Sequence, residues 1–156
     1  MTSILTQIAD AMVEAITAET WPVDFRTQRT YADLDTPSEQ LDAPIVDVVM
    51  PDAYDEHRLD SNGTEAREVT YAVAFRKRFD RDEIDATVGG INQESLDKCL
   101  EVSERLSLLF TALDLSVNCN WIATEGELYR RDDLRDRSQF TAVWLVTFEI
   151  NTIIGA

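Results

Sequence analysis

The segment closest to a metal-binding pattern is Asp80-Arg81-Asp82-Glu83-Ile84-Asp85, which places carboxylates at alternate positions. A calcium loop uses such spacing, but it also needs a glycine at its sixth position and a bidentate glutamate at its twelfth. Asp85 and Ile91 occupy those two positions here. The segment is therefore predicted to be a solvated acidic loop without a metal, and the acidic residues between 52 and 56 are interpreted in the same way.

Nucleophilic and acid–base chemistry has few candidates. The single histidine, His57, lies in a charged segment, and no GxSxG, HExxH, GxGxxG or GxxxxGK pattern is present. Cys99 and Cys119 lie in apolar-periodic segments, which is typical of buried free thiols. We therefore expect no catalytic residue, no cofactor and no enzymatic activity. A rival hypothesis, an enzyme that uses the carboxylate clusters with a divalent metal, predicts that calcium, magnesium or manganese raises the melting temperature.

The charge balance excludes another class of function. Thirty acidic residues against 14 basic ones leave 156 residues with a net charge of −16. A protein that grips phosphates needs Lys and Arg facing the nucleic acid, so specific DNA or RNA binding is not expected. No apolar run approaches the ~20 residues of a membrane helix, and Met1 to Thr20 has no Lys or Arg, unlike a signal peptide. We expect a soluble cytosolic protein made of one domain, residues 1–156.

Two helices are predicted. Apolar residues recur at three and four positions from Ile4 to Ile16, with Thr2 or Ser3 as the N-cap and Pro22 as a terminator. A second stripe runs from Leu96 to Leu113, and Asn92 is its expected N-cap.

Five strands are expected from alternation or dense apolar runs: 23–31, 45–50, 69–79, 117–123 and 140–150. The segment 45–50 is apolar on both faces apart from Asp47, and both faces of the last strand are largely apolar, so both strands are placed inside the sheet. The connections are polar: 32–42 has the composition of a loop, 80–90 is an acidic and then glycine-rich connector, and 125–139 is a polar segment for which no helix or strand is predicted. Asp52 to Glu68 is a long polar stretch around an Asn62-Gly63 turn signal, and it is either an extended hairpin or a mobile loop.

The order of helix, three strands, helix and two strands indicates an α+β fold. We expect a mixed, mainly antiparallel sheet of four to five strands, with two main helices packed on one face. Trp21, Trp121 and Trp144 are interpreted as core residues. Tyr129-Arg130-Arg131 is the one compact basic and aromatic group, a composition enriched at protein interfaces.

This order of landmarks resembles that of the tail terminator proteins, also called tail-completion proteins, of tailed bacteriophages. The resemblance spans nearly the whole chain and rests on no single motif. Its features are an N-terminal amphipathic helix, an Arg26 to Tyr31 strand, the Val46-Asp47-Val48-Val49-Met50-Pro51 strand, a long polar excursion, the Val69 to Phe79 strand, a helix with Leu96, Leu100, Val102 and Leu106, and the closing segments Tyr129 to Asp132, Leu134 to Phe140 and Trp144 to Phe148.

The resemblance implies an α/β-type terminator fold and a virion protein that assembles in the host cytoplasm. It implies a hexameric ring that docks on the tail-tube protein, stops tube growth and faces the head-neck connector protein, with DNA passing through the lumen without specific binding. We expect some of the acidic surplus to line that lumen, since like charge suppresses phosphate contacts. The residues predicted to contact a neighbouring subunit or the tube are Tyr54, His57, Arg58, Leu59, Tyr129, Arg130 and Arg131.

Two alternatives stay open at this point. In the first, the protein is still a virion component but a different neck protein, either a head-completion protein or a stopper. The other is a cytosolic acidic adaptor or regulatory domain. A stable six-membered ring favours the phage hypothesis, whereas a monomer or dimer favours the adaptor. Subunits of a ring join through two different patches, and pairing of sheet edges is one way to do so.

Overall fold

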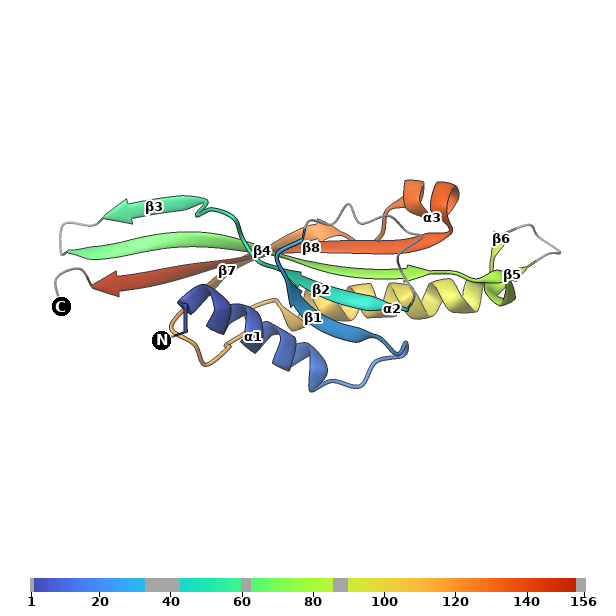
Figure 1. Cartoon of the computed structure of the whole chain (residues 1–156), viewed down its shortest axis with the longest axis horizontal. Coiled ribbons are helices and arrows are strands. Elements are labelled where there is room, and N and C mark those ends of the chain that lie inside the picture. The colour runs from blue at the N-terminus through green and yellow to red at the C-terminus, as the bar shows by residue number, and fades with distance from the viewer. Residues whose placement is uncertain (1, 33–42, 60–62, 86–89, 154–156) are drawn as a thin grey trace.

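Two strands of 15 residues, β4 (Thr64–Arg78) and β8 (Gln139–Ile153), form the central antiparallel pair of the protein (Figure 1). The structure is a computed structural model that describes residues 2–32, 43–59, 63–85 and 90–153. Apolar alternation runs through most of β8 and through β4 from Val69 onward, whereas the first five residues of β4 are mostly polar. The other elements are α1 (Ile4–Thr17), β1 (Arg26–Thr30), β2 (Ile45–Val49), β3 (Glu56–Leu59), a 3₁₀ turn (Arg81–Glu83), β5 (Ile84–Asp85), β6 (Gly90–Ile91), α2 (Gln93–Leu109), β7 (Asn120–Glu127) and α3 (Arg131–Arg137).

The main sheet has the order β1-β2-β4-β8-β7, with β3 paired to β4 as a sixth strand. Only β1 and β2 run parallel; the other pairs in this sheet are antiparallel. The α+β class and the mixed, mainly antiparallel sheet are therefore confirmed. The strand number is higher than the four to five expected, because β3 joins the sheet and β5 and β6 form a separate small ladder.

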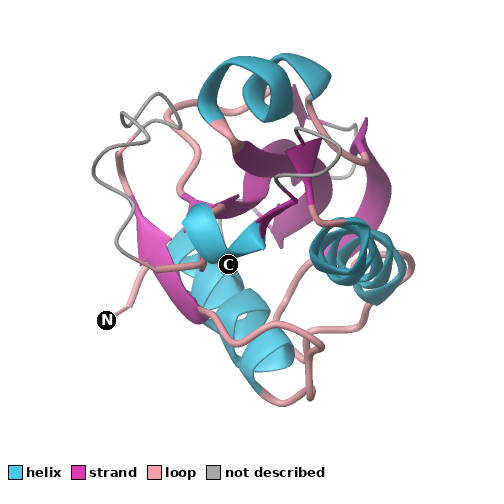
Figure 2. Cartoon of the chain, turned by 90° about the vertical axis from the view of Figure 1, so that its right-hand side faces the viewer, coloured by secondary structure: helices cyan, strands magenta, loops and turns pink. Residues whose placement is uncertain are grey.

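The helices α1 and α2 lie together on one face of the sheet, as predicted (Figures 1 and 2). Ser3 accepts a hydrogen bond from the amide of Leu5, and Asn92 accepts one from Glu94, so both expected caps are present. The helix α1 ends at Thr17, several residues before Pro22. None of the helices within the described residues is long and apolar enough to cross a membrane.

The core lies between these helices and the sheet. Its largest fully buried side chains come from α1, α2 and the inner strands: Tyr71, Phe75, Phe110, Phe140, Phe148, Ile8, Met12, Ile16, Leu106, Val46, Val48 and Val69. The three tryptophans pack against this core as half-buried side chains. Both strands placed inside the sheet, β2 and β8, have partners on each side.

The helix α3 lies on the opposite face of the sheet from α1 and α2 (Figure 2). This helix lies in the polar segment 125–139, where no helix was predicted. Its sequence, RDDLRDR, buries no residue and therefore shows no apolar period. Ser138 ends the helix in the left-handed conformation with φ 50°.

The polar stretch from Asp52 to Glu68 forms a hairpin rather than a loop. β3 pairs with residues 65–68 of β4, on the same side of β4 where β2 pairs with residues 72–76. The pairing register against β4 shifts by three residues between β2 and β3, so the two are not one continuous strand. Pro51 lies in the segment that connects them. Gly63 has φ 77°, as a tight turn requires, whereas Asn62 lies outside the described residues. The predicted loops at 32–42 and 80–90 lie partly outside them too, at 33–42 and 86–89.

Candidate subunit interface

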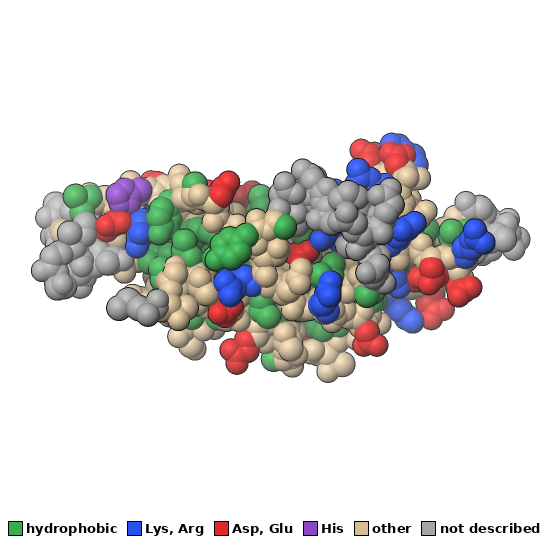
Figure 3. Space-filling view, in the orientation of Figure 1, with side chains coloured by type: hydrophobic (Ala, Val, Ile, Leu, Met, Phe, Trp, Pro, Cys, Tyr) green, Lys and Arg blue, Asp and Glu red, His purple; other side chains and the backbone are tan. Residues whose placement is uncertain are grey.

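The ends of the long strands project past the N-terminal end of α1 as a three-stranded arm (Figure 1). The arm consists of β3, residues 64–70 of β4 and residues 147–153 of β8. Three of the predicted interface residues, His57, Arg58 and Leu59, lie in β3, and a fourth, Tyr54, lies two residues before it. Charged side chains of both signs gather around it in Figure 3.

One face of the arm is organised around Arg58. Its Nη2 lies 2.9 Å from Glu149 Oε2 and 3.9 Å from Glu68 Oε1, and its Nε lies 3.3 Å from Glu56 Oε1. The three carboxylates come from three adjacent strands, because Glu56, Glu68 and Glu149 share one row of the register. One guanidinium against three carboxylates leaves this face negatively charged.

The other face of the arm holds the histidine. His57 Nε2 lies 2.9 Å from Glu65 Oε1, which also lies 3.0 Å from Arg67 Nε. The Arg67 guanidinium is 4.7 Å above the ring of Tyr54 and donates a hydrogen bond to its hydroxyl. Each of these partly exposed contacts contributes modestly to stability. Together they orient Tyr54 and His57 at the surface.

Leu59 is the most apolar exposed feature of the arm, with 67% of its surface accessible. It borders a shallow hollow of about 570 Å³ together with Arg58, Ala66, Glu149 and Asn151. A single exposed leucine is common on protein surfaces, but its neighbour Arg58 is of a residue type that is enriched at protein interfaces.

The remaining predicted residues lie elsewhere. The ring of Tyr129 packs 5.8 Å from that of Phe140, and Arg130 Nε lies 3.8 Å from Glu127 Oε2. Arg131 is exposed at the start of α3. The amide of Arg130 donates a hydrogen bond to the carbonyl of Thr141, which lies nine residues along β8 from Ile150, in the register row of His57; this is a separation of about 30 Å. The structure therefore does not bring the two predicted groups together.

A buried ion pair attaches β1 to the rest of the sheet. Arg76 Nη2 lies 2.5 Å from Asp47 Oδ2, and the residues are 5% and 2% exposed. Gln28 of β1 donates a hydrogen bond of 2.8 Å to the other oxygen of Asp47. Because Asp47 was read only as a polar interruption of an apolar strand, the sequence analysis did not assign it a partner.

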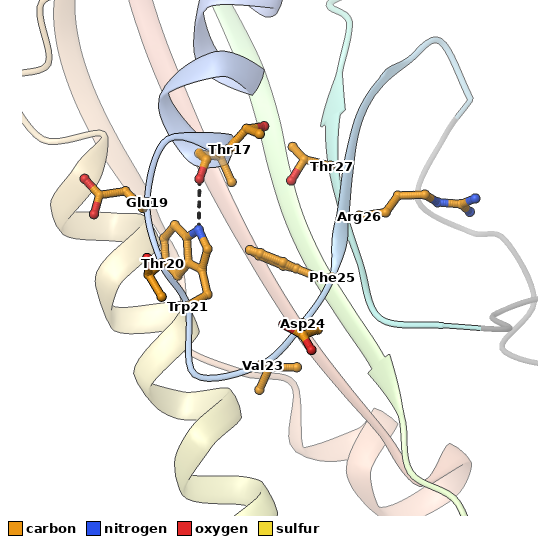
Figure 4. Close-up of a pocket in the computed structure, with 10 residues that line it drawn as sticks. Thr17, Glu19, Thr20, Trp21, Val23, Asp24, Phe25, Arg26 and Thr27 are labelled. Atoms are coloured by element: carbon orange, nitrogen blue, oxygen red, sulfur yellow. Dashed lines mark hydrogen bonds between the residues drawn. The ribbon is translucent and has the colours of Figure 1, made fainter.

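A second hollow, of about 460 Å³, lies where the chain turns from α1 into β1 (Figure 4). Trp21 and Phe25 line it with their ring centroids 5.4 Å apart, and the Arg105 guanidinium covers the Trp21 ring at 4.6 Å. The indole N–H of Trp21 already donates to the carbonyl of Ile16. The Trp21 ring is thus already in contact with residues of both α1 and α2.

The two cysteines differ in burial, and both have raised pKa values. Burial raises the pKa of Cys99 to about 12, and burial with the charge of Asp114 raises the pKa of Cys119, so both thiols stay protonated at neutral pH. Cys99 is buried as predicted, whereas Cys119 is only half-buried. Within the described residues, no three His, Cys, Asp or Glu side chains converge on a metal position.

The acidic segment after β4 has a structural role. Asp80 caps the 3₁₀ turn, and Glu83 bonds to Lys77 at 2.7 Å. Burial alone would raise the pKa of Glu83, but the hydrogen bond and charge of Lys77 lower it below its ordinary value.

Comparison of the sequence with models of protein families and with curated proteins finds no match for this chain.

Proposed function

We propose that the protein is a structural subunit of a bacteriophage tail, which forms a ring on the end of the tail tube and stops its elongation. The same ring would join the tail to the head-neck connector. The observation that carries the proposal is the three-stranded arm, which extends beyond the helical layer and presents Leu59 and Arg58 at its surface. The proposal also draws on the order of sequence landmarks, which resembles that of tail terminator proteins.

The shape of the subunit fits such an assembly. A ring needs two different contact patches on each subunit, and closure prevents a filament. An arm at one end of an elongated domain can contact a neighbour, or the tube beneath it, while the core of the domain stays intact. The acidic balance suits a ring through which DNA passes, because a negative wall attracts few phosphates.

The test is the mass of the purified protein by light scattering, with negative-stain images of the same sample and a binding assay on purified tail tubes. The wild type should form six-membered rings, alone or on the tubes. Deletion of residues 52–68 should abolish both, while the β2–β4 pairing at residues 45–49 and 72–76 remains available to the folded monomer.

A point variant separates loss of assembly from loss of folding. Leu59→Asp changes an exposed side chain of the arm and should also prevent assembly. Leu108→Asp is the matched control, since Leu108 is an exposed leucine of α2 far from the arm in sequence. A wild-type protein that forms no ring and binds no tail tube would refute the proposal and favour the adaptor hypothesis. A ring that binds the connector but not the tube would assign another neck role.

A further inference from the structure

The outer edge of β1 is basic. Its sequence, Arg-Thr-Gln-Arg-Thr, has no acid, in a protein whose net charge is −16. Arg29 is paired with Asp10 of α1 at 3.0 Å, while Arg26 is exposed and takes part in no ion pair within the described chain. The amide of Arg26 and the carbonyl of Thr30 face β2. By alternation, the backbone groups of Thr27 and Arg29 therefore face outward, where no strand of the described chain lies.

The outer edge of β7, on the opposite side of the sheet, is acidic. Glu125 and Glu127 are both exposed, and the only ion pair either makes in the described chain is the 3.8 Å contact of Glu127 with Arg130. A bulge lies between Trp121 and Ala123, and Ile122 there is 42% exposed. Charges and bulges protect edges from random pairing, but here the two edges carry opposite charges.

The opposite charges lie on the same face of the sheet. Gln28 shares the face of its register partner Asp47, so Arg26 and Thr30 lie there too. The register partners of Asp47 on β4, β8 and β7 lie on this same face, and they lead to Glu127 of β7. Glu125, two residues away on the same strand, lies on that face as well. Residue pairs that face each other on one side of a sheet interact directly, and opposite charges stabilise such pairs.

The strand directions also match. β1 runs antiparallel to β7, so a second copy placed beside the first in the same orientation brings its β7 antiparallel to β1. If the two copies lie at the same height, Gln28 of one copy lies opposite Glu127 of the other, because the two residues belong to the same row of the sheet. A shift of two residues places Arg26 opposite Glu127, Gln28 opposite Glu125 and Thr30 opposite Ala123. The same shift places Tyr31, which is 75% exposed, opposite Ile122.

Pairing of like edges is disfavoured by the same charges. A β7–β7 contact would bring four glutamates together, and a β1–β1 contact would bring the arginines together. The charge pattern therefore favours the head-to-tail contact, which generates rings or filaments rather than two-fold dimers.

We propose that β1 of one copy pairs antiparallel with β7 of a second copy in the shifted register, so that the sheet continues from subunit to subunit. The inference rests on the proposed function, in that the second copy is the neighbouring subunit of the ring. The partner is thus this same chain, held by backbone pairing at two opposite edges, by the Arg26–Glu127 pair and by the Tyr31–Ile122 contact.

Cysteine cross-linking of the full chain tests this pairing. Thr30→Cys and Ala123→Cys, in a Cys119→Ser background, leave every charge in place. Within one copy the two positions are four strand spacings apart, about 19 Å, which no disulfide spans. Mild oxidation should therefore give a ladder of dimers, trimers and larger species. Either single cysteine should give no ladder, and neither should the control pair Thr30→Cys with Glu101→Cys on the exposed side of α2.

Charge reversal gives a second, independent readout. Arg26→Glu alone, and Glu125→Arg with Glu127→Arg, should each weaken self-association about tenfold per contact. An equimolar mixture of the two variants should regain assembly, because each repaired contact then joins unlike copies. Such rescue is not expected from a variant that merely unfolds.

The outcomes separate this inference from the proposed function. A ladder no stronger than that of the control pair overturns the β1–β7 pairing, whether or not rings are seen. Rings without the ladder leave the ring function standing with a different contact. A ladder with open filaments and no binding to tail tubes supports the pairing and refutes the ring.

Discussion

Removing the carboxylate of Asp47 should be among the most destabilising single changes on the sheet. Asp47→Ala leaves Arg76 charged and almost completely buried, and it also removes the acceptor for Gln28. Within the described chain, Nε and Nη1 of Arg76 already have no hydrogen-bond partner, so the guanidinium has no second acceptor to turn to.

The expected magnitude follows from burial. Breaking a buried ion pair by removing one partner costs about 3–5 kcal/mol. For a protein of this length each kcal/mol lowers the melting temperature by about 2–4 °C, so the drop should be about 6–20 °C. Asp47→Leu combined with Arg76→Met removes both charges and should recover most of this loss.

Urea unfolding followed by circular dichroism measures these differences. Asp10→Ala is the matched control, because Asp10 pairs with Arg29 of β1 at 3.0 Å but on an exposed surface, where the cost should be about 1 kcal/mol or less. The reasoning is refuted if Asp47→Ala unfolds within about 1 kcal/mol of the wild type, or if the double variant is as unstable as the single one. Since Gln28 anchors β1, Asp47→Ala should also reduce the cross-linked ladder.

Two further predictions concern the sheet and its acidic connector. Gly126→Ala should destabilise the protein by about 1–3 kcal/mol, because a Cβ there would overlap the backbone carbonyl of Val143. Thermal unfolding measures this loss, and Glu125→Ala, at the exposed neighbouring position, is the control. The lowered pKa of Glu83 means that its pairing with Lys77 stabilises the fold above the ordinary carboxyl pKa, and that this contribution is lost as the pH falls through the lowered value. Glu83→Gln should therefore flatten the acid side of the stability-against-pH curve, and an unchanged acid limb would contradict the role given to Lys77.

Local patterns in the sequence are enough to predict the main elements. The apolar stripe of α1, its cap at Ser3 and the cap of α2 at Asn92 depend on neighbours within one or two turns, and the structure has them where they were expected. The alternation around Tyr71 likewise predicts the centre of β4. Such signals survive in a single sequence because the residues that produce them are close along the chain.

The same reasoning placed residues 54–59 in a projecting segment but could not choose between hairpin and loop. β3 has no apolar alternation, since all four of its residues are exposed. Its pairing depends on the edge of β4 and on charges from β8, such as Glu149, which is 91 residues from Arg58. The short helix α3 was missed for a similar reason, as none of its residues is fully buried and only Leu134 packs against the core.

Local patterns along the chain therefore predict most of the helices and strands, the α+β class, the two-helix layer on one face and the acidic surface. Which residues meet across the sheet depends on the tertiary structure. It paired Asp47 with Arg76, placed Gly126 against the carbonyl of Val143, separated Tyr129 from the arm and left a basic edge opposite an acidic one. The physical reason is that strand order and register bring together residues far apart in the chain, and a periodic pattern records which face a residue takes but not its neighbour on that face.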